Sequence, residues 1–139
     1  MKTDDSETKT KPAGTILVVD DNPINLKLVS DLLVFEGYRV LKAADGEKAA
    51  TCVQTDPPEL ILLDVDLPGV DGLTLTQRLK GDRRTADIII VALTAFAMKG
   101  DRQRAMAAGC DGYVTKPIDT RKLPGQVAEL LQRRNKEKT

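Results

Sequence analysis

Short apolar runs alternate with stretches of helical periodicity along this chain, and this alternation constrains its fold more than any other feature. The runs ELILLDV and IIIVALT are apolar at consecutive positions, a pattern typical of strands that are buried on both faces. A shorter run, GYVTK, follows near the C-terminus. We expect strands at 15–20, 39–43, 59–65, 88–94 and 112–116.

Each expected strand is followed by residues that favour a helix. After the first strand, Asn22 suits an N-cap and Pro23 fits the first helical position. The apolar residues that recur at helical spacing there are expected to form the buried face: Ile24, Leu28, Val29, Leu32 and Leu33. Further helices are expected at about 46–54, 72–80 and 97–107, with a last one that ends at about Arg134. Pro124 must then lie in the first turn of the last helix.

This order of elements predicts the α/β class, with a (βα)₅ arrangement. Apolar strands that alternate with helices imply a doubly wound, five-stranded parallel sheet covered on both faces. A chain of 139 residues suits one domain. We expect this domain at 15–134, a disordered polar tail at 1–14 and a short polar C-terminal tail at 135–139.

Composition excludes several classes of function. Lys and Arg together number 21, as do Asp and Glu, so the chain lacks the basic excess of a nucleic-acid binder. It contains no histidine, which excludes catalysis by its own histidine and any histidine zinc site. No run is long enough to span a membrane and no secretory signal is present, so we expect a cytoplasmic protein with reduced cysteines.

Functional side chains gather at the ends of the expected strands. The first strand ends at Asp20 and Asp21, the third at Asp64, the fourth at Thr94 and the fifth at Lys116. In open parallel sheets, ligands bind outside the carboxyl ends of the strands. Carboxylates in one crevice repel one another, and a hard divalent cation such as Mg²⁺ offsets that repulsion.

The same residue types suit phosphoryl transfer. Asp64 can be the nucleophile that forms an acyl phosphate, and the carbonyl of Asp66 can be a further metal ligand. Lys116 and the Thr94 hydroxyl can hold the phosphoryl oxygens. The sequence therefore predicts a Mg²⁺ site, with Mn²⁺ as an alternative ion, formed by Asp20, Asp21, Asp64 and the carbonyl of Asp66.

Two further side chains are expected to set the lifetime of such a phosphoryl group. Asp66 lies two residues after the acceptor, where it can repel the phosphoryl group, bind a water of the metal or position the attacking water. Phe96, two residues after Thr94, can shield the same position. The basic residues Lys99, Arg102 and Arg104 are interpreted as one solvated helix face.

At this point the motifs VVDDNPIN, LLDVDLPGVDG, ALTA and YVTKPID resemble the receiver domain of two-component response regulators over about 15–134. The resemblance implies a flavodoxin-like fold with strand order 2-1-3-4-5. It implies that Asp20 and Asp21 bind Mg²⁺ and that Asp64 accepts phosphate from a histidine kinase or a phosphotransfer protein. The stretch ALTAFAMKGDRQRAMAAGCDGYVTKPID is similar to receivers that act alone or belong to hybrid kinases.

The resemblance carries further expectations. Thr94 and Tyr113 correspond to the residues that move on activation, and the Lys116–Pro117 peptide bond corresponds to one that is usually cis. The face formed by the fourth helix, fifth strand and fifth helix would change its binding of a downstream protein. We expect a monomer or a weak phosphorylation-dependent dimer, without nucleic-acid or membrane partners. The protein would catalyse only its own phosphorylation and dephosphorylation.

The alternative is a Mg²⁺-dependent phosphohydrolase of the haloacid-dehalogenase type. LLDVDLPG contains the DxD pattern of that class, in which Asp64 would be the nucleophile and Asp66 the general acid. The acidic pair precedes the nucleophile here, Pro68 replaces the usual Thr or Val, and no segment is long enough for a cap. A Rossmann-like nucleotide binder is disfavoured because no Gly-rich loop follows the first strand.

Overall fold

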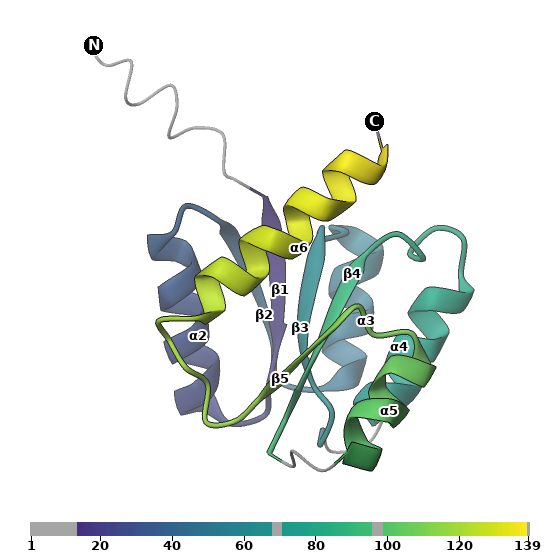
Figure 1. Ribbon diagram of the computed structural model, residues 1–139, viewed down its shortest axis with the longest axis horizontal. Coiled ribbons are helices and arrows are strands. Elements are labelled where there is room, and N and C mark those ends of the chain that lie inside the picture. Colours follow the sequence, from purple (N-terminus) through teal and green to yellow (C-terminus); the bar gives the residue numbers. More distant parts are fainter. Residues whose placement is uncertain (1–13, 68–70, 96–98, 139) are drawn as a thin grey trace.

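The computed structural model contains a parallel sheet with helices on both faces, and it describes residues 14–67, 71–95 and 99–138 (Figure 1). Its strands are β1 (Thr15–Val19), β2 (Arg39–Ala43), β3 (Leu60–Asp64), β4 (Ile89–Thr94) and β5 (Gly112–Thr115). They pair in the order β2-β1-β3-β4-β5, and each pair is parallel. The predicted fold class and strand order are therefore confirmed.

The helices are α2 (Pro23–Phe35), α3 (Gly46–Thr55), α4 (Gly72–Gly81), α5 (Lys99–Ala108) and α6 (Leu123–Lys138). Asn22 is the N-cap of α2, where its side chain accepts hydrogen bonds from two backbone N–H groups. Helix α6 runs past the expected end at about Arg134, because Lys and Glu continue a helix well after its apolar pattern has ended. No helix in the described ranges is both long and apolar enough to span a membrane.

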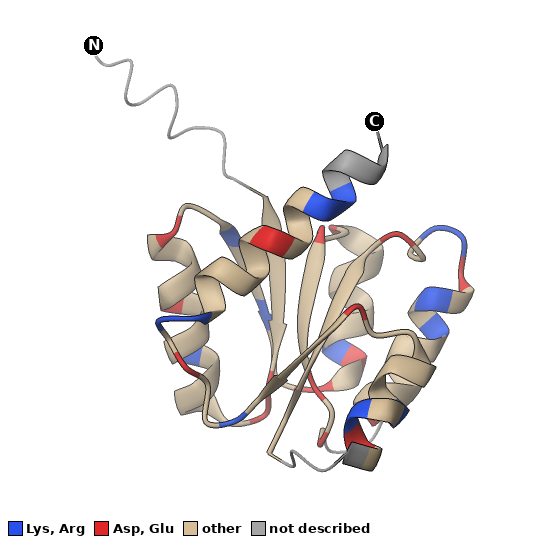
Figure 2. Ribbon diagram, viewed as in Figure 1, with Lys and Arg blue, Asp and Glu red and all other residues tan. Residues whose placement is uncertain are grey.

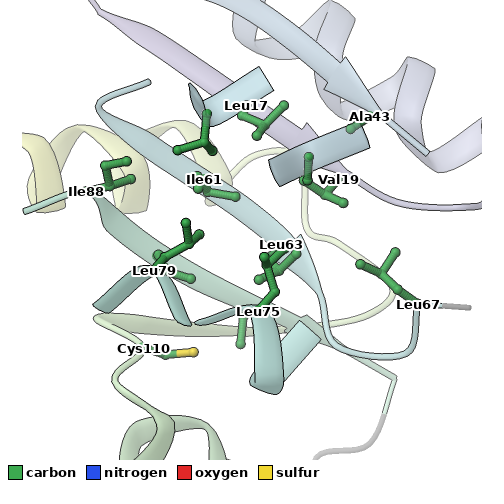
Figure 3. Close-up of a cluster of buried hydrophobic side chains, with 14 of the residues drawn as sticks. Leu17, Val19, Ala43, Ile61, Leu63, Leu67, Leu75, Leu79, Ile88 and Cys110 are labelled. Atoms are coloured by element: carbon green, nitrogen blue, oxygen red, sulfur yellow. The ribbon is translucent and has the colours of Figure 1, made fainter. Parts of the chain in front are cut away.

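The sheet separates two apolar clusters, because successive side chains on each strand point to opposite faces. On β1, Leu17 and Val19 join one cluster, whereas Ile16 and Val18 join the other. The first cluster packs the sheet against α3, α4 and α5, and Figure 3 shows its strand residues facing Leu75 and Leu79 of α4. The second packs the opposite face against α2 and α6. Burial on both faces accounts for the continuous apolar runs in the sequence.

Helix α2 does not bury the whole face that its sequence predicts. Ile24 is 76% exposed and Leu28 is 47% exposed, although both were expected to face the core. The buried side is formed by Val29, Ser30 and Leu33. Helix α2 carries more apolar residues than one side of a helix can place against the sheet. The apolar spacing of α2 is therefore compatible with burial of either of two sides of the helix, and packing against the sheet determines which side is buried.

Candidate functional site

The paired ends of β1 and β3 bring three carboxylates together. Val19 is paired with Leu63, so Asp20 and Asp64 follow at the same level of the sheet. One carboxylate oxygen from each of Asp20, Asp21 and Asp64 lies within 4.8 Å of the others. Figure 2 shows these acidic segments where β1 and β3 end. The predicted clustering of the three side chains is therefore confirmed.

Lys116 joins this cluster from the end of β5. Its Nζ donates a hydrogen bond to Asp64 Oδ2 at 2.9 Å and lies 3.3 Å from Asp20 Oδ2. Its backbone N–H donates to the carbonyl of Thr94 at 2.7 Å, which ties it to the end of β4. The Lys116–Pro117 peptide bond is cis, as the resemblance implied.

The site concentrates negative charge in a buried place. Asp20 is 1% exposed and Asp64 is 2% exposed, whereas Asp21 is exposed. Burial raises the pKa of Asp20, although a backbone hydrogen bond from Asn22 and the charge of Lys116 oppose the rise. Burial disfavours the charged form of Lys116, but its hydrogen bond to Asp64 and the charges of Asp64 and Asp20 leave its pKa raised.

These residues fit a Mg²⁺ ion. Among the described residues, the buried Asp20 Oδ2 is satisfied only by its ion pair with Lys116 at 3.3 Å, and Asp21 adds an exposed carboxylate beside it. Mg²⁺ takes oxygen ligands and retains several waters, so a set of two or three carboxylates is sufficient. Asp66 lies at the same site, because its backbone N–H donates to Asp64 Oδ1 at 2.9 Å. The ligand role of its carbonyl stays a prediction.

Thr94 and Tyr113 line a small cavity beside the carboxylates. Thr94 is buried at the end of β4, and Tyr113, which is partly buried, is paired with Ala92. The cavity measures about 30 Å³. Its other lining residues are Val65, Asp66, Leu73, Asp101, Arg104 and Ala105. Phe96, predicted to affect the phosphoryl lifetime, lies outside the described residues.

Arg104 is the residue at this cavity that the sequence did not indicate. It was interpreted as part of a solvated face, and its largely exposed guanidinium does bind Asp101 Oδ1 at 2.7 Å, but both side chains also line the cavity. The i, i+3 spacing of Asp101 and Arg104 predicts such a pair. Nothing in the sequence of α5 says which side of the helix faces the site, because its apolar residues are mostly Ala.

Comparison with known proteins identifies the family. A sequence model of the response regulator receiver domain matches residues 16–128. The polar-differentiation response regulator DivK of Brucella ovis is 41% identical over 104 residues, which cover 75% of this chain and 85% of that protein. The chain therefore belongs to the response regulator receiver family, whose members interact with histidine kinases or phosphotransfer proteins.

Solved structures agree with this assignment. A CheY-like receiver domain protein from Methanospirillum hungatei JF-1 matches with a TM-score of 0.82 and 29% identity, over 88% of this chain and 97% of that one. The receiver domain of a sensor histidine kinase from Pseudomonas aeruginosa PAO1 matches with a TM-score of 0.74 and 34% identity, over 86% and 95%. That structure has a magnesium ion coordinated in its active-site cleft.

Receiver domains bind Mg²⁺ in an acidic site, which agrees with the cluster of Asp20, Asp21 and Asp64. Membership of the receiver family makes the chain a phosphoacceptor type of signalling domain. The haloacid-dehalogenase alternative is not supported, because the family match and the structural matches all point to receivers.

Proposed function

We propose that Asp64 accepts a phosphoryl group from a phosphohistidine on a partner protein. The observation that carries the proposal is the placement of the Asp64 carboxylate, which is buried among Asp20 and Asp21 and hydrogen-bonded to Lys116 at 2.9 Å. Since the chain contains no histidine, the donor histidine must belong to the partner. A histidine kinase or a histidine phosphotransfer protein has the required chemistry.

The two oxygens of Asp64 have different surroundings. Oδ1 accepts from the backbone of Asp66, and Oδ2 accepts from Lys116. In the transfer, an Asp64 oxygen attacks phosphorus and the bond from phosphorus to the donor nitrogen breaks. Lys116 and the Thr94 hydroxyl then hold phosphoryl oxygens. A Mg²⁺ held by Asp20, Asp21, Asp64 and the Asp66 carbonyl would neutralise negative charge on the carboxylates and the phosphoryl group.

The transferred group then acts as a switch. A phosphoryl group brings charge and three acceptor oxygens to the end of β4. Thr94 moves toward these oxygens, and Tyr113 moves with it. The surface of α5, β5 and α6 then changes its affinity for a downstream protein. The protein catalyses only its own phosphorylation and dephosphorylation. It is a monomer or a weak phosphorylation-dependent dimer, and its receiver domain spans 15–134. Asp66 and Phe96 set the phosphoryl lifetime.

The test is the intact mass of the protein after incubation with a small phosphodonor and Mg²⁺, beside the variant Asp64→Ala. We expect one added phosphoryl group that is absent without Mg²⁺ and absent in the variant. Steady release of phosphate from small esters without an adduct would instead support a hydrolase. An adduct that persists in Asp64→Ala would assign the acceptor elsewhere.

A further inference from the structure

We propose that Arg104 is a positioning residue of this site, which pairs with the Asp66 carboxylate once Asp64 is phosphorylated and so slows loss of the phosphoryl group. The inference rests on the proposed function of Asp64. It assigns a role to a residue that lies on α5, away from the strand ends that hold the acceptor and the carboxylates.

Arg104 and Asp66 line the same small cavity. The cavity of about 30 Å³ has Asp66, Thr94 and Tyr113 on its strand side and Arg104 on its α5 side. A cavity of this size has room for a water molecule, so Asp66 and Arg104 both line one small space. Among the lining residues that the structure describes, Arg104 is the only cation, and Arg102 of the same helix is not one of them.

The charges around the cavity favour a change of partner for Arg104. Arg104 is held by Asp101 at 2.7 Å, in a pair whose arginine is 71% exposed. Although Asp101 is only 24% exposed, solvent screens the guanidinium, so the pair contributes little and Arg104 can change its partner carboxylate. The exposed Asp66 carboxylate forms no ion pair with any described residue. Phosphorylation of Asp64 replaces a carboxylate of one negative charge by an acyl phosphate of about two, and this added negative charge increases the attraction for Arg104.

Dephosphorylation of Asp64 requires a water molecule beside the phosphoryl group. A water oxygen attacks phosphorus, the bond from phosphorus to the Asp64 oxygen breaks, and inorganic phosphate leaves. The proton of the water passes to a base, and the Asp64 carboxylate is restored. A free Asp66 carboxylate beside the acceptor can orient this water and take its proton. When Asp66 is bound to Arg104, it is less available for either task.

The experiment measures the half-time of the phosphorylated protein after the small phosphodonor is removed and Mg²⁺ is retained. Arg104→Ala should shorten the half-time by at least about threefold, a change on the scale of one surface ion pair. Arg104→Lys should retain most of the half-time of the unaltered protein, because the positive charge is kept. Arg102→Ala is the matched control, an exposed arginine on the same helix, and should behave as the unaltered protein.

A double-mutant cycle separates positioning from a structural effect. In the background Asp66→Asn, the change Arg104→Ala should leave the half-time unaltered, because the carboxylate that Arg104 binds is gone. The proposal is overturned if Arg104→Ala equals Arg102→Ala, or if its effect persists with Asp66→Asn. If the unaltered protein takes up no phosphoryl group from the donor, the proposed function fails and this inference fails with it.

Discussion

Lys116 controls the charge balance of the three clustered carboxylates. Its ammonium group lies against Asp64 and Asp20, both of which are almost fully buried. A buried carboxylate without a counter-charge is costly, and the exposed Asp21 adds a further negative charge nearby. One side chain therefore offsets the negative charge of the carboxylates, and in the proposed function the same ammonium group holds a phosphoryl oxygen.

We expect Lys116→Ala to lower the free energy of unfolding of the metal-free protein by about 2–3 kcal/mol, because it leaves two buried carboxylates without their cation. Urea denaturation in the presence of a chelator measures this loss, and added Mg²⁺ should recover part of it. Lys42→Ala, which removes an exposed lysine from β2, should change the stability by less than about 0.5 kcal/mol. Equal stability of the two variants would contradict this account of Lys116.

At the residue scale, the sequence predicts the location of side chains that directly follow strands. It does not predict the location of side chains that depends on how a helix is oriented about its own axis. Asp20, Asp64 and Lys116 are predictable because parallel strands end at one edge of the sheet. Ile24 is exposed because of the orientation of α2 about its own axis. Arg104 lines the cavity because of the orientation of α5 about its axis. Apolar spacing does not determine that rotation when a helix is rich in apolar residues or in Ala.

At the scale of elements, the start of α4 is packed directly on the end of β3. Asp71 caps the helix through its side chain, and Gly72 donates its backbone N–H to the carbonyl of Val65. A Cβ at Gly72 would lie 2.6 Å from the carbonyl oxygen of Asp64 and 2.7 Å from Val65 Cα. Only glycine allows this approach, so α4 helps to fix the backbone that carries the acceptor.

Gly72→Ala should therefore destabilise the protein by about 1–3 kcal/mol and reduce phosphorylation of Asp64, because the backbone at Asp64 and Val65 must shift. Gly81→Ala is the matched control on the same helix, where an added Cβ meets nothing within 4 Å. That control should be neutral or stabilising by up to about 1 kcal/mol. Denaturation curves and the extent of phosphorylation measure both effects, and similar behaviour of the two variants would refute the close-packing argument.

Helix α2 presents exposed apolar side chains beside the acidic site. Ile24 and Leu28 lie one turn apart, and Ile24 is close in sequence to Asp21. Exposed apolar groups of this kind are suited to contact with another protein. We expect Ile24→Ser with Leu28→Ser to slow transfer from a phosphohistidine protein about tenfold or more, while phosphorylation by a small donor is unchanged. An equal loss with both donors would mean that the site itself was damaged.

At the scale of the whole molecule, the parallel strands of the sheet together hold the residues of the site in position. The carboxylates come from β1 and β3, Thr94 from β4 and Lys116 from the end of β5, so no single element contains the site. The alternation of apolar runs and helical segments was enough to predict this architecture, because few arrangements bury strands on both faces. The strand order itself came from resemblance to a family, since the spacing of elements does not determine it.

Because the site spans the sheet, Mg²⁺ binding should stabilise the entire fold. A ligand that binds only the folded state adds about 2.7 kcal/mol at one hundred times its dissociation constant. We therefore expect the Tm to rise by several degrees with MgCl₂ at constant ionic strength, and chelation to reverse the rise. Asp21→Asn should raise the Tm of the metal-free protein, because it removes one of three mutually repelling charges, and should weaken the response to Mg²⁺. Thermal melts followed by circular dichroism measure both effects. A Tm that is indifferent to Mg²⁺, or that rises equally in Asp21→Asn, would show that these carboxylates do not hold the ion.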